Sequence, residues 1–317
     1  MKKFILKSCV YLIGVTMIFS MIILLMDKNK MNFNQVSNSV SLNRKIDFIK
    51  KGAFTPKILS VGSSMNLNNL NSEIIKNNLN ISNKEYLNVS SWGTTVSEDY
   101  FLLKTFLLHF NKVESVFYTI NFNSFQELEM NNRVFIDYKL LEKYLNNNSF
   151  FSGFSLKTST FYRFFSDYRY VSFLSDSLFY TSLKYDSSGG VNLPTNNFRI
   201  IPERFRNFPK NELDKKKISY LDSIIDLCLK KKIDLNIILS PVRTKLIEAS
   251  SNQEKNDFIK KKNDLSNLLK SKGIFFYDSN TETYPDHLFA DGSHLLDEGS
   301  KKLTQDFIDL KFLHKKE

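Results

Sequence analysis

The sequence predicts an α/β fold in which helices cover a parallel sheet. Five short runs of apolar and β-branched residues have the character of buried strands, and helical apolar spacing fills most of the intervals between them. Strands that alternate with helices in this way are typical of a parallel, doubly wound sheet. A chain of 317 residues is long enough to bury one large core of this kind.

The chain begins with an apolar segment long enough to span a membrane. Three lysines in the first seven residues precede an uninterrupted apolar run from Cys9 to Met26. A helix of about 18 residues is about 27 Å long, close to the hydrocarbon thickness of a bilayer. Because the run does not end in the small residues of a cleaved signal, we predict a tail and uncleaved anchor over residues 1–27. The basic tail favours a cytoplasmic N-terminus and an extracytoplasmic domain, against the opposing charges of Lys28 and Lys30.

The elements of the domain follow a polar stretch. Residues 28–56 are rich in asparagine, with one amphipathic stretch near residues 46–49, and we interpret them as a stem. The domain is expected over residues 57–317. The predicted strands cover residues 57–61, 86–89, 113–120, 233–239 and 274–277, and the clearest helical patterns cover residues 98–110, 218–231 and 257–272.

A long insertion, at about residues 125–211, interrupts the alternation once. It is crowded with Phe, Tyr and Ser, its apolar spacing is mainly helical, and Gly189-Gly190 closes it. We interpret it as a cap over or beside the site. Its aromatic residues either pack the core of the cap or line an acceptor groove or a membrane surface. In the second case four arginines meet anionic groups: Arg163, Arg169, Arg199 and Arg204.

Composition excludes several classes of function. The formal net charge is +11, but the lysines are scattered among acidic residues and no recognition motif for nucleic acid accompanies them. Biased codon usage also explains the frequent Asn, Lys and Ile. Cys9 and Cys228 lie in unrelated segments, so no disulfide is expected. The four histidines form no metal motif, and no Walker loop or G-x-G-x-x-G fingerprint indicates a cofactor.

Polar residues and a glycine follow four of the predicted strands. Ser64 follows the first strand in VGSSMN, Gly93 the second, and Asn123 the third, while Asp291 and His294 follow the fifth in DGSHLLDEG. Because ligands of an open parallel sheet gather beyond the carboxyl ends of its strands, we expect these residues to meet. A hydroxyl, an imidazole and a carboxylate are the parts of a Ser-His-Asp triad.

Each of these motifs alone has a simpler interpretation. A Gly-Ser-Ser segment is more often a turn or a helix N-cap, and an Asp-x-x-His segment is common by chance. Their joint occurrence at predicted strand ends favours the triad. Ser63 is the alternative nucleophile, and His287, beside Asp286, is the alternative imidazole.

In their order and positions, these residues resemble the SGNH (GDSL) hydrolase family. The resemblance covers the chain from about residue 57 to the C-terminus, except the insertion. Its four blocks correspond to Gly62-Ser63-Ser64, Gly93, Asn121-Phe122-Asn123-Ser124 and Asp291-Gly292-Ser293-His294. Ser63 replaces the usual Asp of the first block, and Asn121 and Ser124 replace the usual Gly and Asp of the third.

The resemblance implies a three-layer α/β/α domain and a role for each residue. Ser64 would be the nucleophile, His294 the general base and acid, and Asp291 the residue that orients the imidazole. The backbone N–H groups of Ser64 and Gly93 and the side-chain amide of Asn123 would bind the oxyanion.

A Gly-Ser-Ser block after a single anchor resembles the DltD-type branch of the family. This resemblance implies a serine esterase or O-acyltransferase that acts on acyl esters, expected to be acetyl esters, of cell-envelope or exported polysaccharide. A polytopic membrane acyltransferase would supply the acyl group, and no cofactor is implied. The alternatives are a polysaccharide deacetylase and a non-catalytic accessory protein that binds polymer or the membrane partner.

Overall fold

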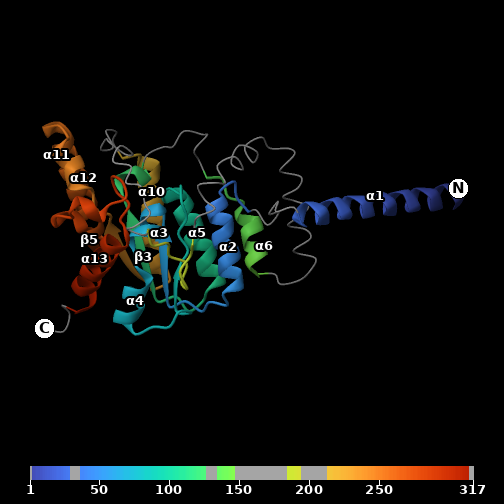
Figure 1. Ribbon diagram of the computed structural model, residues 1–317, viewed down its shortest axis with the longest axis horizontal. Helices are drawn as coiled ribbons and strands as arrows, with labels where there is room; N and C mark the ends of the chain where they lie inside the picture. Colours follow the sequence, from blue (N-terminus) through green and yellow to red (C-terminus); the bar gives the residue numbers. More distant parts are fainter. Residues whose placement is uncertain (1, 29–35, 126–133, 147–183, 194–212, 314–317) are drawn as a thin grey trace.

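The fold is built on a parallel sheet of five strands in the order β2-β1-β3-β4-β5. The computed structural model describes residues 2–28, 36–125, 134–146, 184–193 and 213–313 (Figure 1). All neighbouring strands are parallel. The α/β prediction is confirmed, and each strand lies within two residues of its predicted position. The strands are β1 (Ile58–Gly62), β2 (Tyr86–Asn88), β3 (Ser115–Ile120), β4 (Asp234–Leu239) and β5 (Phe275–Asp278).

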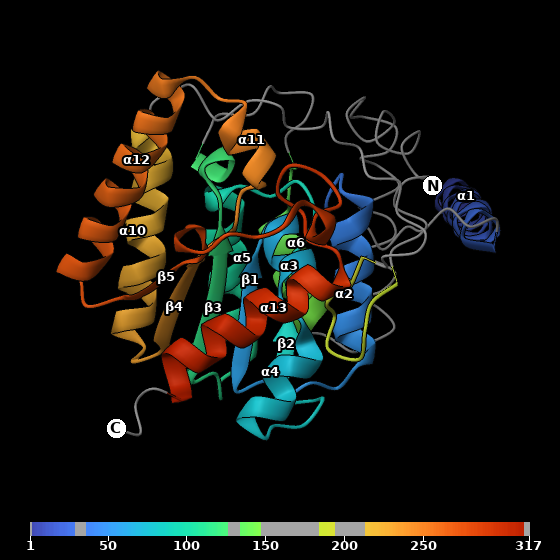
Figure 2. The same ribbon diagram turned by 60° about the vertical axis from the view of Figure 1, so that its left-hand side comes forward.

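Helices cover both faces of this sheet (Figures 1 and 2). Successive side chains of a strand point to opposite faces, so Leu59 and Val61 pack in one core while Ile58 packs in the other. The first face is covered by α5 (Val96–His109), α10 (Lys215–Lys230) and α12 (Asn252–Ser271). The second is covered by α3 (Ser64–Asn69), α4 (Ser72–Leu79) and α13 (Asp297–Ile308).

The three helices predicted from the sequence are present, and all of them lie on the first face. Their caps explain where two of them begin. The side chains of Thr95 and Glu98 form a capping box at α5, and those of Ser251 and Glu254 form one at α12. Each box satisfies backbone N–H groups that the first turn leaves without an intrahelical acceptor.

The segment before β1 differs from the expected stem. Residues 40–51 form α2 (Val40–Lys51), whose apolar stripe of Leu42, Ile46 and Ile49 is buried in the same core as α5. Three polar residues of α2 are also buried, Ser41, Asn43 and Lys45. The Lys45 ammonium donates to the Asn88 carbonyl at 3.0 Å and to that of Gly189. The polar composition of this segment therefore did not indicate that it contains a packed helix. Residues 36–51 pack into the core of the domain and are not a linker.

The N-terminal helix α1 (Lys2–Lys28) stands apart from the domain (Figure 1). Its stretch Lys2–Met21 is long and apolar enough to cross a membrane, and none of that stretch is buried against the protein. Of the insertion expected at residues 125–211, the structure describes residues 134–146, which include helix α6 (Tyr138–Asn146), and residues 184–193. The aromatic clusters and the arginines Arg163, Arg169, Arg199 and Arg204 lie outside the described residues.

We expect Ile46→Ala to lower the free energy of unfolding by about 2 to 4 kcal/mol, because it leaves a cavity at a fully buried position. Lys51→Ala, at an exposed position of the same helix, is the control and should change it by less than about 0.5 kcal/mol. Urea unfolding followed by circular dichroism measures both. Equal, small effects would show that α2 does not pack into the domain in solution.

Candidate active site

The structure places all the candidate residues beyond the carboxyl ends of the strands. Ser64 is the first residue of α3, directly after β1, and Gly93 follows β2. Asn123 lies in the short 3-10 helix η1 (Phe122–Phe125) after β3. Asp291 and His294 lie in the loop between β5 and α13. The chain reverses its direction across the sheet between β1 and β3, and in such sheets this edge is where a binding crevice forms.

Asp291 and His294 form a hydrogen-bonded pair. Asp291 Oδ2 lies 2.7 Å from His294 Nδ1, and both side chains are nearly buried. The second carboxylate oxygen, Oδ1, accepts hydrogen bonds from the backbone N–H groups of Ser293 at 2.9 Å and His294 at 2.8 Å. A carboxylate acceptor requires Nδ1 to carry the proton, which leaves Nε2 as the basic nitrogen.

These contacts determine how Asp291 ionises. Burial raises the pKa of the carboxyl, but the hydrogen bonds from the His294 side chain and from the two backbone N–H groups outweigh it. The pKa of Asp291 is therefore held below its usual value, and the residue is ionised at neutral pH. An ionised carboxylate in this position stabilises a charged imidazole.

The turn before Ser64 depends on a glycine. Gly62 has φ +145°, and a Cβ atom there would lie 2.8 Å from the Cβ of Asn66 and 2.9 Å from the Thr119 carbonyl oxygen. The turn allows α3 to begin directly after β1, with Ser64 partly exposed and Ser63 buried. Exposure thus favours Ser64 over Ser63 as a nucleophile. In the described part of the chain, no hydrogen bond joins the Ser64 hydroxyl to His294 Nε2.

Three fully buried asparagines attach α3 to its surroundings: Asn66, Asn68 and Asn69. The Asn66 amide donates to Ser90 Oγ at 2.6 Å, and its carbonyl accepts from the Thr119 N–H at 3.1 Å. Asn66 therefore links α3 to the loop after β2 and to β3. Sequence reasoning missed these residues because asparagine is frequent along the whole chain. The signal that marks them is three asparagines within six residues, directly after a predicted buried strand.

The two further oxyanion candidates sit in constrained turns. Gly93 has φ +77°, a backbone conformation that favours glycine. The side-chain Oδ1 of Asn121 accepts hydrogen bonds from the Ser124 N–H at 2.9 Å and the Ser124 hydroxyl at 3.0 Å. The two residues that depart from the family's third block thus close the turn that carries Asn123, which is partly exposed. Among the described residues, the Asn123 amide has no hydrogen-bond partner.

A tryptophan that the sequence analysis did not single out lies against the imidazole. The rings of Trp92 and His294 stack with their centroids 6.2 Å apart. Trp92 precedes Gly93, so this contact places the imidazole beside the loop after β2. Trp92 also packs against an apolar cluster that includes Val191 and Leu193 of the insertion's returning segment. Residues 184–193 therefore border the site.

The alternative imidazole does not form a comparable pair. The Asp286 carboxylate is bonded to Arg243 Nη2 at 3.1 Å and to Lys245 Nζ at 2.9 Å, and the His287 side chain is exposed. Of these two Asp-His pairs, it is Asp291 and His294 whose carboxylate and imidazole are hydrogen-bonded to each other.

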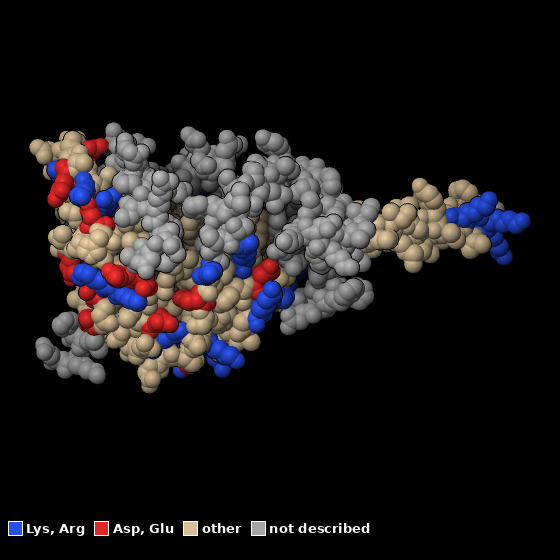
Figure 3. Space-filling model, in the orientation of Figure 1, with Lys and Arg blue, Asp and Glu red and all other residues tan. Residues whose placement is uncertain are grey.

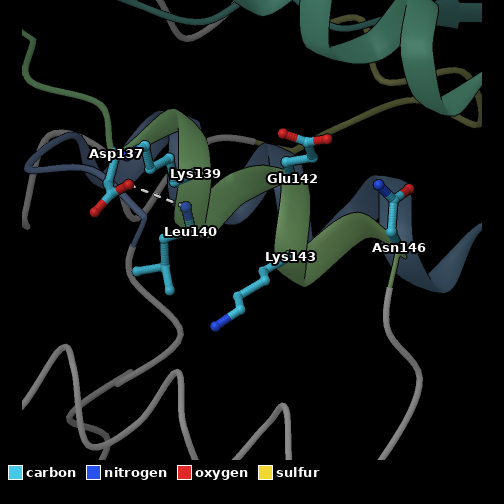
Figure 4. Close-up of a pocket in the computed structure, with 6 residues that line it drawn as sticks. All are labelled: Asp137, Lys139, Leu140, Glu142, Lys143 and Asn146. Atoms are coloured by element: carbon cyan, nitrogen blue, oxygen red, sulfur yellow. Dashed lines mark hydrogen bonds between the residues drawn. The ribbon is translucent and has the colours of Figure 1, made fainter.

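Other features of the described surface do not indicate a binding site that includes the candidate residues. Figure 4 shows a pocket along α6, lined by polar residues and Leu140, which contains none of the candidate residues. Acidic and basic side chains are interspersed over the face of the domain in Figure 3, without a continuous basic stripe. Within the described ranges, no group of three or more His, Cys, Asp or Glu side chains could hold a metal ion.

The chain matches no model of a known protein family and no curated protein sequence. Its site is therefore interpreted from its own geometry.

Asp291→Asn keeps the oxygen that accepts the two backbone N–H groups but removes the charge. A carboxyl whose pKa is lowered on folding contributes stability above its unfolded pKa and loses it as the pH falls through its folded pKa. We expect the variant to be less stable than wild type at pH 7 by about 2 kcal/mol, the typical contribution of hydrogen bonds to a charged group. The difference should shrink as the pH falls below about 4, the usual pKa of an aspartate. Urea unfolding at a series of pH values measures it. A difference that does not depend on pH would contradict this assignment.

Proposed function

We propose that this chain is a membrane-anchored, SGNH-type serine esterase or O-acyltransferase. Its substrates are acyl esters, acetyl esters foremost, of cell-envelope or exported polysaccharide. The observation that carries the proposal is the Asp291 to His294 hydrogen bond of 2.7 Å, in a loop bonded to the helix that begins at Ser64. An oriented imidazole next to a partly exposed hydroxyl at the edge of a parallel sheet is suited to acyl transfer.

The proposed reaction proceeds through an acyl-enzyme. His294 Nε2 takes the proton of the Ser64 hydroxyl as its oxygen attacks the ester carbonyl, and Asp291 stabilises the imidazolium that forms. The Ser64 N–H, at the first position of α3, has no intrahelical acceptor and is available to the oxyanion together with the Gly93 N–H and the Asn123 amide. One such donor contributes about 3 to 4 kcal/mol in the transition state.

The second half of the reaction decides the class of enzyme. His294 returns the proton to the leaving alcohol and then activates the acceptor. If water is the acceptor, the product is a free acid and the protein is an esterase. If a sugar hydroxyl is the acceptor, the acyl group is transferred to polysaccharide, in keeping with a polytopic membrane acyltransferase as the donor.

The proposed location is argued from α1. As an uncleaved anchor with its basic end in the cytoplasm, α1 would hold the domain at the outer face of the membrane. Figure 3 shows basic side chains at the free end of this helix. An acceptor polymer assembled at or exported through the membrane would then reach the site.

One observation favours a second candidate function. In the third block, Asn121 and Ser124 stand where the SGNH family has Gly and Asp, as in a protein that keeps the fold to bind polymer or a partner without catalysis. Because Asp291 and His294 are hydrogen-bonded, we rank this non-catalytic role second.

A fluorophosphonate probe distinguishes the two, because it modifies only an activated serine. We expect the wild type to be labelled, Ser64→Ala to abolish labelling, and His294→Ala to slow it by about 1,000-fold or more. Ser63→Ala is the matched control and should keep most of the labelling. A folded wild type that is not labelled would favour the non-catalytic role, and labelling lost in Ser63→Ala alone would move the nucleophile.

A further inference from the structure

Asn69, the last residue of α3, bonds the chain on both sides of the candidate imidazole. Its amide nitrogen donates to the Ser293 carbonyl at 2.9 Å, and its carbonyl accepts from the Leu295 N–H at 2.8 Å. The same nitrogen donates to Ser240 Oγ at 2.8 Å. The Asn69 side chain is fully buried, so these bonds do not compete with water.

This arrangement needs an amide side chain. A primary amide presents a donor and an acceptor in one plane, as a peptide group does, and here it pairs with the two peptide groups that flank His294. Asn69 thereby substitutes for a neighbouring strand along residues 293–295. Hydroxyl, carboxylate and apolar side chains lack this combination of a paired donor and acceptor.

The position of Asn69 along α3 gives these bonds a consequence for Ser64. The two residues are the ends of one short helix, about 7.5 Å apart along its axis. Asp291 fixes the orientation of the imidazole within its own loop, but it lies in the same loop and cannot fix where that loop stands relative to Ser64. Among the described contacts, the Asn69 amide connects the backbone around His294 directly to the helix of the nucleophile.

We infer that Asn69 is a positioning residue of the candidate active site, which sets the placement of His294 relative to Ser64. This role rests on the proposed function, whereas the physical claim, that Asn69 holds the His294 loop in place, does not. A displacement of about 1 Å between a nucleophile and its base lowers a rate by about 100-fold. The amide of Asn69 is therefore expected to affect reactivity far more than its distance from the reacting atoms suggests.

Asn68 provides a matched control. It is the neighbouring residue of the same helix, it is also fully buried, and its amide donates to the Val191 carbonyl at 2.9 Å. Among the described residues, its side chain makes no hydrogen bond to residues 291–295. A general loss of α3 packing would appear in variants of both asparagines, whereas a loss of positioning would appear in variants of Asn69 alone.

The test uses the full-length protein in detergent micelles and two readouts. The first is the rate of fluorophosphonate labelling. The second is independent of catalysis: Trp92 is the one tryptophan of the chain and stacks on His294, so its fluorescence reports protonation of that imidazole. The variants are Asn69→Leu, which removes all three bonds at similar volume, and Asn68→Leu. Asn69→Asp, which keeps only the acceptor, replaces Asn69→Leu if that variant does not fold.

We expect wild-type fluorescence to fall on acidification, with a transition that His294→Ala removes. Asn69→Leu should reduce the amplitude of this transition by more than half, because the displaced loop moves the imidazole away from the Trp92 ring. It should also slow labelling by about 10- to 100-fold. Asn68→Leu should leave the amplitude unchanged and alter labelling by less than about threefold.

The remaining outcomes contradict the inference. An unchanged transition in a folded Asn69→Leu protein, an equal loss of amplitude in Asn68→Leu, or a wild-type transition that does not depend on His294 would each overturn it. If the wild type is not labelled but Asn69→Leu still reduces the amplitude, the proposed function fails while the placement of His294 by Asn69 stands.

Discussion

The candidate site depends on the hydrogen bonds that three buried asparagine amides of α3 make to other segments of the chain. A buried amide without partners destabilises a protein by several kcal/mol, so α3 is stable only where those segments supply their donors and acceptors. The loop after β2, strand β3, the returning segment of the insertion and the loop of His294 all do so. The packing of α3 into the core and the assembly of the candidate site therefore depend on the same hydrogen bonds.

The site combines this long-range requirement with a local one. The Asp291 to His294 bond and the two backbone bonds to Asp291 all lie within four consecutive residues. Such a loop orients the imidazole without help from the rest of the chain, but it does not determine where the ring lies relative to Ser64. That position depends on the hydrogen bonds of Asn69 and on the stacking of Trp92, and both residues are more than 200 residues away in sequence.

The five strands were predictable because their apolar residues are contiguous and their ends are marked by polar residues and glycine. Asp291 and His294 were also predictable, since three residues of separation put them in one loop. The role of α2 was not, because Asn43 and Lys45 are buried by partners that only the folded chain supplies. The same reason hid Asn69 and Trp92, whose significance lies in contacts with residues 293–295 and His294 rather than in any local pattern.

The departures of the third block from the family also have a structural meaning. Asn121 and Ser124 bond to each other and close a 3-10 turn, so the position of Asn123 is defined by these residues rather than by a Gly and an Asp.

The most direct test of the account is a crystal structure of the protein after reaction with a fluorophosphonate. We predict a phosphonyl group on Ser64 Oγ, with one oxygen bonded to the Gly93 N–H and the Asn123 amide and His294 Nε2 beside it. A phosphonyl group on another residue, or one whose oxygen faces away from Gly93 and Asn123, would contradict it.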